Sequence, residues 1–495
     1  MIRINHFING AWKESQKSGD EKYLEGLNPA TGKVFYQLAR GTGKEVDLAV
    51  EAAEAAFPSW SGLPPESRAK FLDLIADGIE ARKKEFARAE SDDQGKPYTL
   101  AMNLDIPRAI QNFRFFASRL RQWEQSSTQV DSETINYVLR KPRGVVALIS
   151  PWNLPLYLLS WKIAPAIAVG NTAVCKPSEV TSLTAHLLTE VFQQVGLPQG
   201  VVNHVYGLGS EAGERLVGHP SVKTISFTGG TVTGQRISAA VAGEMKKLSL
   251  ELGGKNPTLV FADAPKKDLF QQLVRASFLN QGEICLCGSR IYVEESFYAE
   301  FIEKFVAEVQ MLIVGDPASD RTFMGPLVSK DHLEKVKSFI QLAKDEGGRI
   351  LTGGLPDNQF PEKLIREGHL REDQKVGYWL APTVIAGLPE SSKCIQEEIF
   401  GPVVTIGTFK TFDEAIQKAN QVKYGLSASV WTENLKTAHH SAQRLQAGTV
   451  WINTWLNRDL RMPFGGTKAS GVGREGGDYS FEFFTEATTV CVKTP

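Results

Sequence analysis

Hydrophobic positions repeat with a helical period through much of the N-terminal part of the chain. Apolar side chains recur at spacings of three and four over residues 44–57 and 66–90, as on the buried face of an amphipathic helix. A third helical stretch, at about residues 104–123, has the same period. Residues 6–40 instead carry short β-type runs separated by turn signals. We therefore expect a short β-rich beginning followed by helices.

From residue 144 onward, short apolar runs alternate with helical stretches. This alternation predicts a parallel sheet covered by helices on both faces. A second α/β segment follows, with a helix at 268–280 that leads into a glycine turn and a strand at 290–293. The predicted strands of the first sheet are residues 145–149, 172–175, 201–205, 224–227 and 247–252. The pattern thus indicates an α/β protein with a doubly wound first sheet.

Two further segments read as strands outside this alternation. Residues 125–143 are polar and then alternate between apolar and polar positions, which is typical of a hairpin that leaves the body of a domain. The last residues, 488–492, look like a single strand without a local partner. Such a strand often pairs with another element or another subunit.

The length and composition set broad limits on the class of protein. A chain of 495 residues is too long for one core, so two or more domains are expected. The composition is ordinary for a soluble globular protein, with 42% hydrophobic and 22% charged residues. A net charge of -1 gives no reason to expect nucleic acid or an anionic membrane as a partner.

The number of cysteines and the lengths of the apolar runs indicate the cellular compartment in which we expect the protein. Five cysteines, an odd and sparse set, argue against a disulfide framework and for a reducing environment. Cys285 and Cys287 form a C-x-C pair, but no second Cys/His cluster accompanies it, so we expect no metal site. No apolar run reaches the length of a membrane span, and the first residues do not read as a signal peptide. We expect a cytoplasmic protein.

Two residues carry the candidate chemistry. Cys285 follows a glycine turn, and Glu251 is a single carboxylate at the end of an apolar strand that runs into two glycines. Taken singly, each has an ordinary interpretation, because free cysteines are often buried and a carboxylate at a strand end is often solvated. Taken together, a thiol and a carboxylate supply the nucleophile and the base that covalent catalysis needs.

A doubly wound sheet favours a dinucleotide at the carboxyl ends of its strands. The G-x-G-x-x-G pattern is absent after the first strand, but Gly229, Gly230 and Gly234 follow the fourth strand and would let backbone amides approach a phosphate. A packing turn is an equally good interpretation. After the second strand, Lys176 and Glu179 could bind ribose hydroxyls, and Glu179 would favour NAD over NADP by repelling a 2′-phosphate; the alternative is a helix cap.

A series of motifs, in order along nearly the whole chain, resembles the NAD(P)-dependent aldehyde dehydrogenase superfamily. The resemblance implies a Rossmann-like cofactor domain (1–124 and 144–254), an α/β catalytic domain (255–477) and an oligomerisation β-arm (125–143 and 478–495). It also implies a homodimer or homotetramer joined through the arm. The motifs are Pro151-Trp152-Asn153, Lys176-Pro177-Ser178-Glu179, Phe227-Thr228-Gly229, Glu251-Leu252-Gly253-Gly254-Lys255, Gly282 to Cys285, Glu398-Ile399-Phe400-Gly401-Pro402 and Pro463-Phe464-Gly465-Gly466.

The resemblance also assigns roles to residues. Cys285 would attack the aldehyde carbon, and the oxyanion would accept hydrogen bonds from the Asn153 amide and the Cys285 backbone N–H. After hydride transfer to NAD, Glu251 would activate water to hydrolyse the thioester. Lys162 and Glu475 match positions that the family links to proton relay. The positions that match the family's cofactor contacts are Trp152, Lys176, Ser178, Glu179, Gly229, Gly230, Gly234, Leu252, Glu398 and Phe400.

One departure concerns the cysteine turn. Glu283 stands where the family usually has glutamine, and we expect a carboxylate so near the thiol to raise its pKa.

Arg108 and Arg458 lie in segments that, within the family, resemble the 2-aminomuconic and 2-hydroxymuconic semialdehyde dehydrogenases. A guanidinium offers a two-pronged contact to a carboxylate, so a small anionic semialdehyde is the predicted substrate, with Trp161 and Phe464 as further substrate contacts. Arg108 on a solvated helix face, and Arg458 paired with Asp459, are the structural alternatives. The rival functions are a dehydrogenase for apolar aldehydes, such as retinal or fatty aldehydes, and a non-catalytic binding or structural member of the fold.

Overall fold

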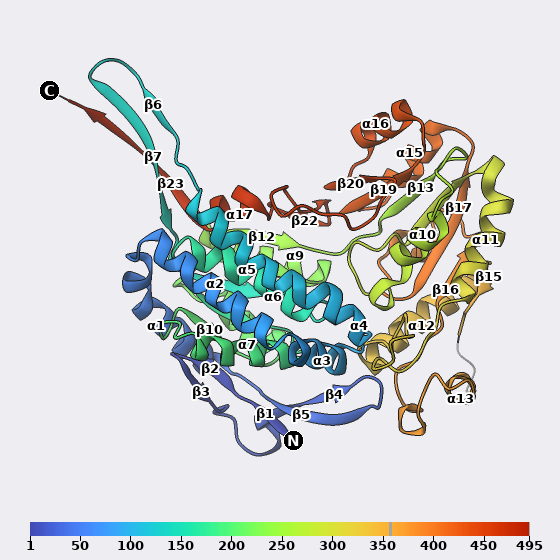
Figure 1. Cartoon of the computed structure of the whole chain (residues 1–495), viewed down its shortest axis with the longest axis horizontal. Helices are drawn as coiled ribbons and strands as arrows, with labels where there is room; N and C mark the ends of the chain where they lie inside the picture. The colour runs from blue at the N-terminus through green and yellow to red at the C-terminus, as the bar shows by residue number, and fades with distance from the viewer. Residues whose placement is uncertain (356–358, 495) are drawn as a thin grey trace.

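Two large sheets and one projecting β-arm make up the protein in the computed structural model, which describes residues 1–355 and 359–494. Figure 1 shows the first sheet with its helices on one side of the molecule and the second sheet on the other, with the arm leaving the first. Both sheets are α/β layers, as the alternation of apolar runs predicts. The part of the chain that the structure describes contains no helix long and apolar enough to cross a membrane.

The first sheet has eight strands in the order β22-β12-β11-β8-β9-β10-β2-β3. Its five central strands run parallel and correspond to the five strands predicted from the sequence. The flanking strands, which come from the two ends of the chain, are antiparallel. The strands are β2 (His6–Ile8), β3 (Ala11–Lys13), β8 (Val145–Ile149), β9 (Thr172–Lys176), β10 (Val202–His204), β11 (Val222–Thr228), β12 (Lys247–Glu251) and β22 (Gly471–Val472).

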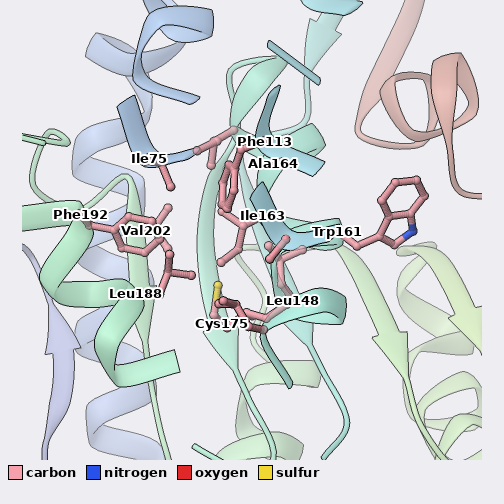
Figure 2. Packing of buried hydrophobic residues seen from close by; sticks show 14 of the residues in the cluster. Ile75, Phe113, Leu148, Trp161, Ile163, Ala164, Cys175, Leu188, Phe192 and Val202 are labelled. Atoms are coloured by element: carbon pink, nitrogen blue, oxygen red, sulfur yellow. The ribbon is translucent and has the colours of Figure 1, made fainter. Parts of the chain in front are cut away.

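Helices cover both faces of this sheet because successive strand residues point to opposite sides. Val146 and Leu148 pack into one core, whereas Val145 and Ala147 pack into the other. Figure 2 shows Leu148 and Cys175 packed below Ile163 and Phe113 in the larger core. The covering helices are α1 (Gly43–Ser61), α2 (Pro65–Ala81), α3 (Lys83–Gln94), α5 (Ile106–Arg121), α6 (Pro155–Ala168), α7 (Leu183–Gln194), α8 (Glu214–Val217) and α9 (Thr231–Val241).

Two predicted helical stretches differ in detail from the structure. The stretch predicted over 66–90 is two helices, because the backbone leaves the helical region at Arg82 (φ -108°, ψ 18°) between α2 and α3. The stretch predicted from about 104 begins earlier, with α4 (Tyr98–Leu100) and a π-helical turn (Ala101–Asp105) that runs directly into α5. Periodicity alone did not separate these cases, since the apolar spacing continues across both junctions.

The second sheet has seven strands in the order β15-β16-β17-β14-β13-β19-β20, all parallel except β15. Its strands are β13 (Pro257–Val260), β14 (Arg290–Glu294), β15 (Arg349–Thr352), β16 (Thr383–Ala386), β17 (Val403–Phe409), β19 (Ser427–Trp431) and β20 (Thr449–Ile452). The accompanying helices are α10 (Leu269–Phe278), α11 (Tyr298–Gln310), α12 (Lys330–Asp345), α13 (Phe360–Arg366), α14 (Lys393–Gln396), α15 (Phe412–Asn420) and α16 (Leu435–Arg444). Helix α17 (Gly477–Phe483) packs instead with the helices of the first sheet, where Phe481 contacts Phe116 of α5. Smaller pairings involve β1 (Ile2–Ile4), β4 (Tyr23–Asn28), β5 (Lys33–Ala39), β18 (Tyr424–Gly425) and β21 (Thr467–Lys468).

The arm is a three-stranded antiparallel sheet in the order β23-β7-β6. It joins β6 (Ser127–Gln129) and β7 (Thr134–Pro142) to the C-terminal strand β23 (Thr485–Lys493), which pairs with β7 along its whole length. The terminal strand therefore has its partner within the same chain. Ile135, Tyr137 and Leu139 on β7 remain 39–42% exposed, and Figure 1 shows the arm extending away from both sheets.

Candidate active site

A strained turn of the backbone precedes Cys285 and positions it. After α10 ends, Asn280, Gln281 and Gly282 adopt consecutive positive φ values of 54°, 57° and 69°. At Gly282 a Cβ would lie 2.3 Å from the carbonyl oxygen of Gly401, so this position requires glycine. The turn reverses the chain and places Cys285 at the junction of two cavities, with its surface partly accessible. Cys287, in contrast, is buried in an apolar cluster and lines neither of the two cavities.

Glu251 lies at the end of β12 and lines the same two cavities as Cys285. Neither of its carboxylate oxygens has a hydrogen-bond partner among the described residues. Burial, followed by the nearby negative charge of Glu475, raises the pKa of Glu251 well above its ordinary value. Burial and the carboxylates Glu398 and Glu251 likewise raise the pKa of the Cys285 thiol. A thiol that resists ionisation thus adjoins a carboxylate with unused acceptor capacity and a raised proton affinity.

Asn153 is fixed against the cysteine turn from both sides. Its side-chain Nδ2 donates to the Glu283 carbonyl oxygen at 2.8 Å, and its own carbonyl accepts from Lys96 Nζ at 3.0 Å and from Asn280 Nδ2 at 3.2 Å. The bond to Glu283 uses one of the two N–H groups of the amide. The sequence motif therefore brings an amide donor beside Cys285, although the two residues come from different sheets.

Lys162 and Glu475, the two positions that the resemblance links to proton relay, are in contact. Lys162 Nζ lies 3.1 Å from Glu475 Oε1 and donates to Ser226 Oγ at 2.8 Å. Ser226 Oγ in turn donates to Glu475 Oε1 at 3.1 Å. Glu475 lines the same cavity as Glu251, so this buried group of Glu475, Ser226 and Lys162 lies beside the cavity that Glu251 lines.

One of the two cavities that meet at Cys285, here called the first cavity, is lined by six of the predicted cofactor residues. Glu398 accepts from the Gly254 backbone N–H at 2.8 Å, and a Cβ on Gly253 would lie 2.2 Å from Glu398 Oε2, so the two glycines seat this carboxylate. Phe400 has a φ of 61° and packs edge-on against Trp152 with ring centroids 5.3 Å apart. The six residues are Trp152, Gly229, Gly230, Leu252, Glu398 and Phe400.

The remaining predicted cofactor residues lie outside this wall. Lys176, at the carboxyl end of β9, pairs with Glu179 at 2.9 Å, and Ser178 Oγ accepts from the Val180 backbone N–H at 3.3 Å. Gly234 lies inside α9, where a Cβ would approach the Leu252 side chain to 2.5 Å. This close approach of α9 to the residue after β12 fits the packing alternative. Gly230, by contrast, precedes α9 and faces open space.

The other cavity that meets the first at Cys285, here called the second cavity, is lined by all four predicted substrate residues. Arg458 lies with its guanidinium carbon 3.6 Å from the Phe464 ring centroid and 5.8 Å from that of Trp161. Its Nη1 donates to Tyr157 Oη at 3.4 Å. Arg108, on α5, lies 5.8 Å from the Tyr157 ring centroid. Both arginines therefore face the cavity that ends at Cys285 and Glu251.

The structural alternatives for these arginines are wrong. Asp459 forms its ion pair with Arg461, at 2.6 Å, and not with Arg458. Arg108 is partly buried and lines the cavity, so it does not lie on a solvated helix face. Within the described ranges, neither Arg108 nor Arg458 forms an ion pair with a carboxylate. Two cations without counter-ions beside one cavity are available to an anionic ligand.

The prediction that Glu283 raises the pKa of the Cys285 thiol is wrong. The Glu283 carboxyl group is buried and accepts hydrogen bonds from Gln94 Nε2 and the Val328 backbone N–H, at 2.6 and 3.2 Å. Its charge acts on the pKa of Cys287, and it is not among the groups that raise the pKa of Cys285.

Several residues of the site gave no signal in the sequence. Tyr157 lines the second cavity, while His332 and Lys335 line the first; Gln94 and Lys96 support the cysteine turn and Asn153. Gln94, Lys96, His332 and Lys335 come from segments far along the chain from both Asn153 and Cys285, so no local motif could have identified them. Tyr157 lies on α6, just after Asn153 but outside the motif. Across the described part of the chain, no group of three His, Cys, Asp or Glu side chains is arranged to hold a metal.

The fold and the site together define a class of protein: a two-sheet α/β dehydrogenase-type protein in which two cavities meet at a cysteine and a carboxylate. The aldehyde dehydrogenase family profile matches residues 12–490, and the chain belongs to this family.

The chain is similar to curated relatives over its full length. It is 48% identical to the 2-aminomuconic semialdehyde dehydrogenase of Bos taurus over 495 residues, covering 100% of this chain and 99% of the relative. It is 44% identical to the 2-hydroxymuconic semialdehyde dehydrogenase of Pseudomonas sp. (strain CF600), with 100% of both covered. The solved NAD+ complex of an aldehyde dehydrogenase from Bacillus cereus superposes with a TM-score of 0.93 at 36% identity, covering 100% of this chain and 97% of that one.

Proposed function

We propose that this protein is an NAD-dependent aldehyde dehydrogenase that oxidises a small, carboxylate-bearing semialdehyde, such as 2-amino- or 2-hydroxymuconic semialdehyde, to the acid. The observation that carries the substrate class is the pair of unpaired guanidinium groups, Arg108 and Arg458, in the cavity that ends at Cys285. Each guanidinium can bind a carboxylate through two parallel hydrogen bonds. The names of the curated relatives agree with this class.

In the first step, the Cys285 sulfur attacks the aldehyde carbon. The thiol proton leaves towards Glu251, whose unpartnered oxygens face the same cavity, as the C–S bond forms and the carbonyl electrons move to oxygen. The free N–H of the Asn153 amide and the Cys285 backbone N–H would stabilise the oxyanion. NAD, when bound, supplies the acceptor for the hydride that leaves the same carbon.

In the second step, the thioester is hydrolysed. Before hydrolysis, Glu251 releases the proton that it took from the thiol. Glu475 and Lys162 would carry this proton away, because Glu475 lines the cavity and contacts Lys162 at 3.1 Å. The ionised Glu251 then removes a proton from water, the water oxygen adds to the thioester carbon, and the C–S bond breaks as Glu251 returns that proton to sulfur.

The residues around the first cavity fit a dinucleotide. Gly230 leaves open space before α9, so the helix amides are free to meet a phosphate, and Glu398 would bind the nicotinamide ribose from its seat on Gly253 and Gly254. Trp152, Gly229, Leu252 and Phe400 form the rest of the wall. Lys176, Ser178 and Glu179 would bind the adenosine ribose at the end of β9, and the Glu179 carboxylate would disfavour NADP. Gly234 would support the site through its packing on Leu252.

The two sheets and the arm also support a division into domains. We place the NAD-binding domain at 1–124 and 144–254, the catalytic domain at 255–477 and the arm at 125–143 and 478–495. The exposed apolar side chains on β7 support a homodimer or homotetramer that forms through the arm. A cytoplasmic location fits the five free cysteines.

The test is a steady-state panel of acidic, neutral polar and long apolar aldehydes with NAD. We expect NADH production that favours the acidic aldehydes and is lost in Cys285→Ala. Preference for fatty aldehydes or retinal would support the rival substrate class. No NADH with any aldehyde would refute the enzymatic proposal and leave a binding or structural role.

A further inference from the structure

We propose that Glu283 is a positioning residue: its carboxyl group fixes the cysteine turn against α3 and α12, and so holds Cys285 and the Asn153 amide in register. This inference rests on the proposed function for its catalytic meaning. Its structural basis is the unusual turn itself, in which Asn280, Gln281 and Gly282 all have positive φ. Such a backbone persists only where surrounding contacts over-determine it.

The Glu283 carboxyl group joins three separate segments of the chain. Its Oε2 accepts from Gln94 Nε2, at the end of α3, at 2.6 Å. Its Oε1 accepts from the Val328 backbone N–H at 3.2 Å and lies 3.5 Å from His332 Nε2 on the first turn of α12. All of these contacts are made by a side chain that is 0% exposed, so water does not compete for them.

The backbone of the same residue holds the oxyanion donor. The Glu283 carbonyl accepts from Asn153 Nδ2 at 2.8 Å, and from Asn280 Nδ2 at 3.3 Å. A shift of Glu283 would therefore move the Asn153 amide and the adjoining Cys285 together. One residue thus couples the placement of the nucleophile to the placement of the group that stabilises its product.

A second link leads to the cofactor side of the site. His332 Nε2 lies 2.6 Å from the Phe400 carbonyl oxygen, and because a carbonyl only accepts, this nitrogen carries a proton and donates. Phe400 is itself held at a φ of 61° and lines the first cavity. The contacts of Glu283 with His332 therefore connect the cysteine turn to the turn that carries Phe400.

The charged and titratable groups around Glu283 are few. Lys96, beyond Gln94, is the cation that acts on it, and Lys96 is already paired with Asp105 at 2.7 Å. Burial lowers the pKa of His332 to about 4, so His332 is neutral at neutral pH. Burial raises the pKa of Glu283 well above its ordinary value, although the bonds from Val328 and Gln94 and the charge of Lys96 act in the opposite direction. Ionisation of Glu283 at higher pH would strengthen both bonds, since carboxylate acceptors bind more tightly than neutral ones.

The experiment measures the rate at which iodoacetamide alkylates Cys285 as a function of pH, without aldehyde or NAD. Wild type, Glu283→Gln and Glu283→Ala are compared, with Cys285→Ala to identify the label. The matched control is Glu334→Ala, which removes an exposed carboxylate of α12 that pairs with Lys337 at 2.8 Å. Aldehyde oxidation by the same variants is measured separately. If the proposed function fails, the alkylation rates still test whether Glu283 positions Cys285.

We expect Glu283→Ala to lower kcat about tenfold, the effect of losing one hydrogen bond to a carboxylate, with the KM for NAD within about twofold. Glu283→Gln keeps the shape and one acceptor oxygen, so it should recover most of the rate but lose one ionisation from the alkylation profile. Glu334→Ala should match wild type. An alanine variant as active as wild type, or a glutamine variant with an unchanged pH profile, would overturn the proposal. If Glu283→Ala does not fold, the glutamine profile alone decides.

Discussion

Replacement of Arg458 by alanine tests the substrate class most directly. The guanidinium lies over Phe464 in the cavity that ends at Cys285 and forms no ion pair with any described carboxylate. Its removal should therefore weaken binding of an aldehyde that carries a carboxylate. It should leave a neutral aldehyde of the same length almost unaffected, because the neutral compound has no group for the guanidinium to bind.

The expected size follows from the bonds that are lost. A hydrogen bond to a charged group contributes about 1.5–3 kcal/mol, and a guanidinium makes up to two such bonds with one carboxylate. Because Arg108 remains in the same cavity and water replaces part of the lost contact, we expect a net loss of about 2.7 kcal/mol, or about 100-fold in kcat/KM. Arg458→Lys retains the charge but loses the two-pronged geometry, so we expect about a tenfold loss.

The assay follows NADH formation with succinic semialdehyde and with butanal, which differ in the terminal carboxylate. Arg461→Ala is the matched control, because Arg461 lies in the same loop but is 77% exposed and pairs with Asp459. We expect the 100-fold loss only for Arg458→Ala with the acidic aldehyde. Equal losses for both aldehydes, or an equal loss in the Arg461 variant, would refute the carboxylate-anchor assignment.

Three further predictions concern the base, the loop beside it and the arm. The rate of aldehyde oxidation should fall as pH decreases through the raised pKa of Glu251, because the base works only when it is ionised. Glu251→Gln should lose about 100-fold or more in kcat, and its pH–rate profile should no longer show this fall at low pH. Gly465→Ala should nearly abolish turnover, because its Cβ would lie 2.8 Å from Glu251 Oε1 at a φ of 154°; activity near wild type would contradict this. Leu139→Asp, on the exposed face of the arm, should dissociate the oligomer into monomers in light scattering, and an unchanged mass would exclude the arm as the interface.

Local sequence patterns predicted the elements that depend on local physics. Strand β8 is a continuous apolar run, as is typical of a parallel strand buried on both faces, and the other four parallel strands of the first sheet mix apolar with polar residues. The glycine turn before Cys285 and the glycine pair after Glu251 were visible because few other residues tolerate such backbone geometry or such close contacts. The break at Arg82 was not visible, since the apolar spacing continues through it.

The candidate site residues also fall into those that a local motif identified and those whose role depended on the folded chain. The motifs brought Cys285, Glu251 and Asn153 to attention, and the structure gathers them at one junction of two cavities. Gly234 lay in a glycine-rich stretch that fitted either a phosphate turn or a packing turn. Only the folded chain shows that a Cβ at Gly234 would meet the Leu252 side chain at 2.5 Å, because α9 packs there against the residue that follows β12.

The sequence by itself determined the fold class, the paired thiol and carboxylate, and the strand that completes the arm, since each rests on residue type and spacing along the chain. The tertiary structure determined which side chains pair with one another. It assigned Asp459 to Arg461 and left Arg458 free, and it turned the Glu283 side chain towards Gln94. Electrostatic and hydrogen-bond effects depend on distances of a few ångströms between segments that are far apart in sequence, and only the folded chain sets those distances.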